Sequence, residues 1–283
     1  MEQVLSGQRA IVIGGGSGIG LGSARLLARD GAEVTLAGRT EQKLRDAAAA
    51  LADEGLTVSW VACDALVPEQ VRAAVDAASD ADGRLHIAVV VPGGGSLVPV
   101  LLFGDDQFSQ EVDQNVRPVY LLLKYAGQAM IRAGGGSFVA VSSTAADFSC
   151  RYLASYSAGK AAVDQLVKVA ANELGEYGVR VNSVRPGFTE TPTTARSLQN
   201  KPMMAEFLAG QAIARHGQVP DIAQAIRYMA GPESSWTTGQ LLTVDGGHTL
   251  RAFPDYLQFL DLPDQGAAAR EHRPSSPRSR IEK

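Results

Sequence analysis

Short apolar runs rich in β-branched residues alternate along this chain with longer segments rich in Ala and Leu. Such alternation is typical of βαβ units and a mostly parallel sheet. It predicts strands over Arg9–Ile13, Glu33–Ala37, Thr57–Ala62, Leu85–Val91, Ser137–Val141, Arg180–Val184 and Leu241–Val244. It predicts helices over Gly18–Asp30, Glu41–Glu54, Glu69–Ala81, Asp106–Ala133, Ser155–Tyr177 and Asp221–Met229. The expected fold class is α/β, with a doubly wound parallel sheet of about seven strands.

The composition fits one domain. The chain has 283 residues, of which 45% are hydrophobic, enough for one substantial core. No change in composition separates two cores, so we expect a single domain over residues 1–263. Within it, Thr193–Gly210 is helix-prone but interrupts the alternation, as a lid would. Residues 264–283 carry Pro, Ser and Arg with few apolar side chains, which predicts a disordered tail.

Charge and cysteine content exclude several classes of function. The net charge is −4, with 26 basic and 30 acidic residues and no basic stripe, so nucleic acid is not an expected partner. The apolar stretches are too short to span a membrane and the first residues do not resemble a signal peptide. Cys63 and Cys150 have neither metal nor redox spacing, and the four histidines are scattered. We therefore expect no metal and a cytoplasmic protein with reduced thiols.

The first expected strand runs directly into a glycine-rich turn, Gly14-Gly-Gly-Ser-Gly-Ile-Gly20, and a helix follows. Glycines permit a tight turn and let backbone N–H groups approach a pyrophosphate at the helix N-terminus. This setting predicts a dinucleotide site of the Rossmann type. The spacing is Gly-x-x-x-Gly-x-Gly and not the usual Gly-x-Gly-x-x-Gly. The residues expected to contact the cofactor are Gly14, Ser17, Gly18, Ile19 and Gly20.

The end of the second strand indicates which dinucleotide is bound. NAD-binding folds tend to place an acid there for the ribose 2′-hydroxyl, whereas NADP binders accommodate the 2′-phosphate with a nearby Arg. Here Gly38 is followed by Arg39 and Thr40, a cation and a hydroxyl with no acid at the strand end. NADP is therefore expected, with NAD less favoured. Asp64, after the third strand, suits either a hydrogen bond to the adenine amino group or a simple turn before a helix.

Tyr156 and Lys160 are four residues apart, so on a helix they share one face. A cation beside a phenol favours the ionised form, which predicts a lowered pKa of Tyr156 and acid–base chemistry near neutral pH. Ser143 follows an apolar run thirteen positions earlier, and its hydroxyl could meet the phenol at one substrate oxygen. Tyr-x-x-x-Lys alone is common, and a surface tyrosine beside a solvated lysine is the ordinary alternative.

With these motifs in this order, the sequence resembles the short-chain dehydrogenase/reductase family, in its compact branch of 3-oxoacyl-carrier-protein reductases. The resemblance covers about residues 5–250. It rests on the glycine turn, on Asn115 and Ser143, and on two longer motifs, Tyr156-Ser-Ala-Gly-Lys160 and Arg180-Val-Asn-Ser-Val-Arg-Pro-Gly187. The segment Thr238–Gly247 is similar to the terminal strand and turn of the family.

The resemblance implies a role for each motif residue. Tyr156 would be the general acid/base and Ser143 would position the substrate oxygen. Lys160 would bind the nicotinamide ribose and tune Tyr156, and Asn115 would hold a water in a proton relay. An Asn within a helix can instead satisfy a neighbouring backbone group. The remaining residues expected near the cofactor are Gly93, Pro186, Gly187 and Thr191.

Two positions depart from the family pattern. Ile13 stands where the family usually has Thr, and Val90-Val-Pro-Gly93 replaces the usual Asn-Asn-Ala-Gly. Because Pro92 has no N–H to donate, these changes put ribose contacts and sheet stabilisation there in doubt.

The sequence thus favours an NADP(H)-dependent oxidoreductase that acts on a ketone and a secondary alcohol. A non-catalytic dinucleotide-binding regulator on the same scaffold is the alternative, and a sugar-nucleotide epimerase or dehydratase is disfavoured by the glycine spacing. The substrate is a small molecule that the sequence does not specify. An apolar pocket is suggested by Phe188, Met203, Met204, Phe207 and Leu208, although core packing explains them as well. By resemblance we expect a homotetramer or homodimer with the helices Asp106–Ala133 and Ser155–Tyr177 at the interface.

Overall fold

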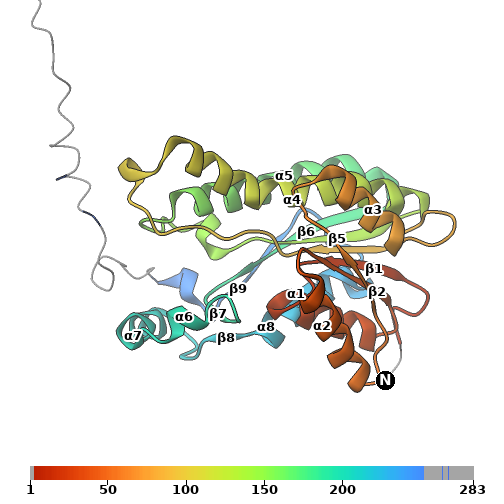
Figure 1. Ribbon diagram of the computed structural model, residues 1–283, viewed down its shortest axis with the longest axis horizontal. Coiled ribbons are helices and arrows are strands. Elements are labelled where there is room, and N and C mark those ends of the chain that lie inside the picture. The colour runs from red at the N-terminus through yellow and green to blue at the C-terminus, as the bar shows by residue number, and fades with distance from the viewer. Residues whose placement is uncertain (1–2, 252–262, 264–266, 268–283) are drawn as a thin grey trace, which may run out of the picture.

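The computed structural model describes residues 3–251, 263 and 267. Its centre is a parallel sheet of seven strands in the order β3-β2-β1-β4-β5-β6-β9 (Figure 1). The strands are β1 (Arg9–Ile13), β2 (Glu33–Gly38), β3 (Ser59–Ala62), β4 (Ile87–Val90), β5 (Gly136–Val141), β6 (Val179–Pro186) and β9 (Leu241–Val244). The predicted α/β class and its parallel sheet of about seven strands are confirmed.

Helices cover both faces of the sheet. The helices α3, α4 and α5 cover one face and the helices α1, α2 and α8 cover the other (Figure 1). Their bounds are α1 (Gly18–Arg29), α2 (Glu41–Asp53), α3 (Pro68–Ala78), α4 (Asp105–Arg132), α5 (Ala154–Leu174) and α8 (Val219–Ala230). This three-layer arrangement is the Rossmann-type architecture expected from the alternation.

Burial of both sheet faces follows from the strand sequences. Side chains alternate between faces along a strand, so a central strand needs apolar residues at every position. In β1, Ile11 and Ile13 pack toward α3, α4 and α5, whereas Ala10 and Val12 pack toward the opposite layer. All four side chains are buried.

The strand ends differ from the sequence-based expectation by a few residues. β4 is shorter than the predicted Leu85–Val91: the Val91 N–H still donates to the Ile13 carbonyl at 3.0 Å, and Pro92 then ends the ladder. Because Pro92 lies outside β4, the hydrogen bonds of that strand do not need an N–H donor at this position. β6 is longer than predicted and reaches Pro186, since it pairs with β5 at its start and with β9 at its end.

The order of the strands determines where a ligand can bind. From β1 the chain continues to β2 on one side, whereas β4 lies on the other side. At such a switch point the connections leave in opposite directions and open a crevice at the carboxyl ends of the strands. The segment Thr193–Gly210, expected to act as a lid, contains α6 (Ala195–Leu198) and α7 (Lys201–Gly210) (Figure 1). The short paired strands β7 (Thr189–Glu190) and β8 (Gly217–Gln218) lie before and after it in the chain.

The tail predicted over residues 264–283 lies outside the described residues, apart from Ala267. The domain boundary at residue 263 therefore stays a prediction. Within the described part of the chain, no helix is both long and apolar enough to cross a bilayer.

Candidate active site

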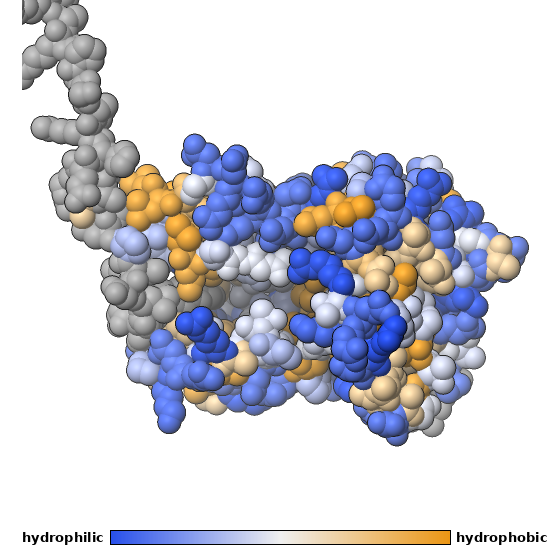
Figure 2. Space-filling model, in the orientation of Figure 1, coloured by the Kyte–Doolittle hydropathy of each residue, from blue (hydrophilic) through white to orange (hydrophobic). Residues whose placement is uncertain are grey.

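A cavity of about 500 Å3 lies at the carboxyl ends of β1, β4, β5 and β6. Its walls come from the glycine turn after β1, the first half of α5, and the segment that follows β6. A second hollow of about 270 Å3 shares Gly14, Arg39 and Gly93 with it and extends toward the ends of β2 and β3. Figure 2 shows a hollow in the middle of this face of the molecule. Together the two spaces form an elongated site across the switch point.

The turn after β1 fits a pyrophosphate because its glycines have no side chains, so a ligand can approach the backbone closely. Gly14 has φ +84°, and a Cβ on it would lie 3.0 Å from the Val91 carbonyl oxygen. A Cβ on Gly20 would lie 2.2 Å from the Gly14 carbonyl oxygen, so only glycine lets α1 begin here. Ser17 precedes α1 without a capping hydrogen bond from its side chain and lines the cavity. Exposed N–H groups at this helix start suit an anion.

The far end of the site contains the residues expected near the adenosine. Arg39 is exposed and lines both spaces, whereas Thr40 lines neither and precedes α2 without a capping bond. Asp64 lines the second hollow, and one of its carboxylate oxygens accepts from the Leu66 N–H at 3.0 Å. The position of Asp64 therefore fits both roles that the sequence left open, the adenine contact and the turn.

Ser143 and Tyr156 meet in the cavity. Ser143 follows β5, where its Oγ accepts a hydrogen bond from the Ala145 N–H at 3.1 Å. Tyr156 is the third residue of α5, and its phenol is hydrogen-bonded to the Ser143 side chain. Both residues line the cavity wall. Two hydroxyl groups from different elements thus converge on one point.

Lys160 lies one helical turn beyond Tyr156 and is 2% exposed. Its Nζ donates to the carbonyl oxygens of Pro92 at 2.9 Å and Val141 at 3.0 Å. The same Nζ lies 5.4 Å from the centroid of the Tyr156 ring. The ammonium is therefore fixed behind the phenol by the ends of two central strands.

The protonation of this pair differs from the sequence-based expectation. Burial raises the pKa of Tyr156 above its usual value, and the hydrogen bond from Ser143 opposes this only in part. Burial also lowers the pKa of Lys160 to about 7, against the attraction of Asp164. The prediction that Lys160 lowers the pKa of Tyr156 is therefore wrong for the protein without cofactor. Loss of solvent acts on both groups and disfavours the charged form of each.

Asn115 lies behind the cavity wall and is fully buried in α4. Its Nδ2 donates to the Glu111 carbonyl at 2.8 Å and to the Gly94 carbonyl at 2.9 Å. Its Oδ1 is buried without a hydrogen-bond partner in the structure and lies 1.8 Å from the place of a Cβ on Gly93. The amide group thus satisfies backbone groups, as the ordinary alternative has it, while its oxygen can still accept a hydrogen bond.

Part of the cavity wall is apolar. Leu153, Phe188 and Phe207 line it, and the two phenylalanine rings lie 4.9 Å apart. Met203 and Met204 are buried in the cluster beneath these rings and do not line the cavity. Leu208, which was grouped with them, is half-buried and also lies outside the lining.

The elongated site contains most of the predicted positions. Residues at its walls are Gly14, Ser17, Gly18, Ile19, Arg39, Asp64, Gly93, Ser143, Tyr156, Lys160, Pro186, Gly187 and Thr191. Gly20, Thr40 and Asn115 lie outside the lining. Sequence reasoning missed the wall residues Leu153, Thr189 and Thr194. Leu153 immediately precedes α5, and its closeness in the chain to Tyr156 was a usable signal.

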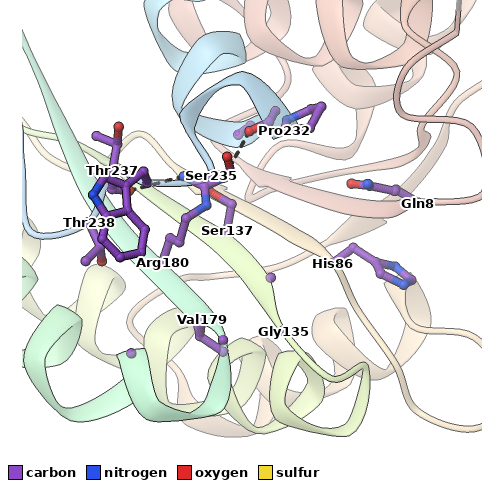
Figure 3. A pocket seen from close by; sticks show the side chains of 16 residues that line it. Gln8, His86, Gly135, Ser137, Val179, Arg180, Pro232, Ser235, Thr237 and Thr238 are labelled. Carbon is purple, nitrogen blue, oxygen red and sulfur yellow. Dashed lines mark hydrogen bonds between the residues drawn. The ribbon is translucent and has the colours of Figure 1, made fainter.

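Another hollow, of about 540 Å3, lies at the opposite, amino-terminal ends of the strands (Figure 3). Its charged residue is Arg180, whose guanidinium donates to neutral oxygens around the end of α8. These acceptors are the carbonyls of Met229, Gly231 and Thr237 and the hydroxyl of Ser234. A cation at a helix C-terminus stabilises the helix, so we assign Arg180 to the fold.

The described residues contain no group of three or more His, Cys, Asp or Glu side chains that could hold a metal ion. Cys63 and Cys150 are free and buried, and burial raises the pKa of their thiols to about 11 and about 12. Neither thiol is therefore a nucleophile at neutral pH.

Comparison with known proteins identifies the family. Residues 14–249 match the family model described as enoyl-(acyl carrier protein) reductase. The chain belongs to the short-chain dehydrogenase/reductase family. A 3-oxoacyl-[acyl-carrier-protein] reductase from Chlamydia muridarum is 32% identical over 87% of this chain and 99% of its own length. As in this family generally, the protein is an oxidoreductase of alcohols and ketones that uses a dinucleotide.

Solved structures of other short-chain dehydrogenases/reductases superpose closely. One from Mycobacterium ulcerans gives a TM-score of 0.87 at 36% identity and covers 90% of this chain and 94% of its own. A 7α-hydroxysteroid dehydrogenase complexed with NADH and 7-oxo glycochenodeoxycholic acid gives 0.83 at 30% identity, covering 89% and 97%. A putative 2-deoxy-D-gluconate 3-dehydrogenase from Agrobacterium tumefaciens with bound NADP gives 0.81 at 27% identity, covering 88% and 99%.

The low pKa of Lys160 predicts an unusual pH dependence of stability. Lys160 has a pKa of about 7 when folded and 10.5 as the ordinary value, so between these pH values the unfolded chain binds the extra proton. The unfolding free energy that Lys160 contributes should therefore rise with pH through this window, by up to about 1.4 kcal/mol per pH unit. Denaturant unfolding of the parent and of Lys160→Met, without cofactor, measures the difference.

The exposed Lys168 on the same helix provides the matched control, as Lys168→Met. The parent and Lys168→Met should gain stability relative to Lys160→Met as pH rises from 7 to 10. Parallel pH profiles for all three proteins would show that Lys160 is solvated and carries its ordinary pKa.

Proposed function

We propose that this protein is an NADP(H)-dependent oxidoreductase that interconverts a ketone and a secondary alcohol, with Tyr156 as general acid/base. The observation that carries the proposal is the convergence of the Ser143 and Tyr156 hydroxyls in the cavity, with the Lys160 ammonium fixed behind them. A carbonyl oxygen at that point would accept hydrogen bonds from both hydroxyls.

In the reductive direction Tyr156 acts as the acid. Its raised pKa keeps the phenol protonated at neutral pH, so it can donate a proton to the developing alkoxide of the substrate. Ser143 orients the substrate oxygen through its hydroxyl. Lys160, when protonated, places a positive charge near the phenolate that remains and so stabilises it.

The nicotinamide cofactor, when bound, supplies or accepts the hydride. The glycine turn and the start of α1 would hold its pyrophosphate, and Thr191 faces that turn, 3.5 Å from the place of a Cβ on Gly18. Pro186 and Gly187 line the cavity beside Lys160 and would border the nicotinamide. A Cβ on Gly187 would lie 2.7 Å from the Asp245 Cβ, so this backbone is packed tightly from behind.

Asn115 is proposed to serve the proton path. Its Nδ2 is engaged by two carbonyl groups, which fixes the plane of the amide. Its buried Oδ1 can then accept from a water molecule, and such a water would connect the buried Lys160 region with bulk solvent. Proton return to Tyr156 would follow that route.

The substrate is proposed to be a ketone with an apolar body. Leu153, Phe188 and Phe207 line the same cavity as Ser143 and Tyr156. Ring faces and a branched alkyl group offer contact area without hydrogen bonds, which favours cyclic or alkyl substituents over polyols.

The alternative of a non-catalytic dinucleotide binder rested on the changes at Ile13 and Pro92. The carbonyl oxygen of Pro92 accepts a hydrogen bond from Lys160, so this substitution keeps a contact to the proposed catalytic group. No observation at the site favours the non-catalytic alternative. The reducing, cytoplasmic location expected from the sequence stays part of the proposal, and the two free thiols agree with it.

A homodimer or homotetramer through α4 and α5 is also proposed. These helices share an apolar groove of about 260 Å3 on the outer surface of the layer. Tyr120 and Val169, on its rim, are 49% and 45% exposed. Exposed apolar groups in a continuous groove are typical of protein interfaces, and a second copy of the same helices offers a self-complementary partner.

Replacing Tyr156 by Phe should abolish turnover and leave NADPH affinity within a few-fold of the parent. The phenol acts on the substrate, whereas Lys160 and the glycine turn hold the cofactor. Steady-state reduction of a ketone panel and fluorescence titration with NADPH provide the two measurements. Tyr177→Phe, at an exposed position, serves as the control. Turnover by Tyr156→Phe close to that of the parent would disprove the assignment.

The parent should prefer NADPH over NADH by roughly 10- to 100-fold in kcat/KM, because a hydrogen bond between Arg39 and the 2′-phosphate is charge-assisted. Solvent screening at this exposed residue places the value toward the lower end. The double variant Gly38→Asp/Arg39→Leu should reverse the preference, since an acid accepts from a ribose hydroxyl and repels a phosphate. Arg72→Leu, on the exposed side of α3, should leave the ratio unchanged.

All kinetics with the two cofactors are compared at one ionic strength. Equal or NADH-favouring kinetics in the parent would mean that Arg39 makes no contact with the 2′-phosphate.

A further inference from the structure

The segment Pro92–Ser96 passes between α4 and α5 and contacts three of the proposed catalytic residues. The Pro92 carbonyl accepts from Lys160. The Gly94 carbonyl accepts from Asn115 at 2.9 Å. A Cβ on Gly95 would lie 2.6 Å from the Cβ of Tyr156, so the bare backbone packs directly on that residue. The relative positions of Asn115, Tyr156 and Lys160 therefore depend on where this segment lies.

Three consecutive glycines make the same segment conformationally permissive. Gly93, Gly94 and Gly95 have no side chains that could anchor them, and glycine loses more backbone freedom on ordering than any other residue. An ordered path thus requires an anchor from outside the glycine run. The structure provides one immediately after the run, at Ser96.

That anchor is the carboxylate of Glu111, which lies on α4 one turn before Asn115 and is 8% exposed. Its Oε2 accepts from the Ser96 N–H at 3.1 Å and from the Ser155 hydroxyl at 2.6 Å. Its Oε1 accepts from Gln107 Nε2 at 3.1 Å, and the Ser96 side chain donates as well. One carboxylate thus joins α4, the glycine run and the residue next to Tyr156.

All the donors that reach Glu111 are neutral, so the site holds an anion without a counter-ion among these contacts. Burial alone would raise the pKa of the carboxyl, but the hydrogen bonds from Ser155 and Ser96 outweigh it and lower the pKa to about 2. Ser155 is the second residue of α5, and the positive end of that helix favours a negative charge nearby. The group is therefore a carboxylate throughout the neutral range.

We propose that Glu111 is a positioning residue for the reaction, a buried carboxylate that fixes the glycine run and the first turn of α5 so that Tyr156 meets the substrate oxygen in a productive geometry. Glu111 does not line the cavity and takes no part in proton transfer. It acts through Ser96 and Ser155. This inference rests on the proposed function, because it assigns Glu111 to the geometry of Tyr156.

The test compares Glu111→Gln with Glu69→Gln, an exposed glutamate on α3. The amide keeps the size of the side chain but replaces one acceptor oxygen by a donor that faces other donors. Glu111→Gln should lower kcat about 10- to 100-fold, because displacements near 1 Å at a reacting group cost up to ~100-fold. The KM for NADPH should stay near that of the parent, and the melting temperature should fall by only a few degrees, because a buried donor loses its acceptor. Glu69→Gln should leave all three quantities unchanged.

Hydrogen exchange provides a readout that does not depend on turnover. In Glu111→Gln, peptides covering residues 92–98 and the start of α5 should exchange faster, while peptides from β1 and α1 should not change. If no ketone is reduced by the parent, the proposed function fails, and this local exchange still decides whether Glu111 fixes the segment.

Two results would overturn the proposal. One is a parent-like kcat with unchanged exchange in Glu111→Gln. The other is a large fall in melting temperature together with a loss of NADPH affinity as large as the loss of kcat. That combination would make Glu111 an ordinary stabilising contact. If Glu111→Gln fails to fold, Ser155→Ala removes one hydrogen bond and leaves the carboxylate in place. It should reproduce the fall in kcat and the faster exchange in milder form, and a parent-like result in both would also overturn the proposal.

Discussion

Two hydrogen bonds from the ammonium group of Lys160 connect the middle of α5 to the carboxyl ends of the central strands. Their acceptors are the carbonyl oxygens of Pro92, just after β4, and Val141, the last residue of β5. These carbonyls would otherwise be buried at the end of the sheet, where unpaired polar groups are costly. The same bonds hold the nitrogen 5.4 Å from the Tyr156 ring. The Lys160 side chain thus links the sheet to α5 and to the proposed catalytic residue Tyr156.

The site also depends on glycines, whose lack of side chains allows close packing of the backbone. The glycine turn after β1 and the run Gly93–Gly95 both place bare backbone close to its neighbours, which for the run are Asn115 and Tyr156. Gly159 also lies against a close neighbour, since a Cβ on it would lie 2.8 Å from the Cβ of Asn115. Close packing of α4 on α5 needs this small residue. Backbone without side chains must be held by contacts from elsewhere, which gives polar anchors such as Glu111 their importance.

Sequence patterns predicted the elements well because they depend on local periodicity and on glycine turns. β1 and β9 have the predicted bounds, and the motif residues of the cavity come from strand ends and helix starts that such patterns reveal. The direction of the pKa shift of Tyr156 was not predictable, because spacing places Lys160 beside the phenol but says nothing about the loss of water around both groups. The role proposed for Glu111 was not predictable from the sequence for a related reason. A glutamate in a helix is usually solvated, and its partners lie 15 and 44 residues away in the chain.

The central claim is that the cavity directs hydride transfer between a nicotinamide and a ketone carbon. Single-turnover reduction with NADPH deuterated at C4, on one face of the ring and then on the other, tests it most directly. A cofactor held, as proposed, between the glycine turn and Pro186–Gly187 would present one face to the substrate. One deuterated form should therefore place its deuterium on the carbinol carbon of the product, and the other should transfer protium. Transfer from both faces, or a product alcohol without deuterium from either form, would contradict the account.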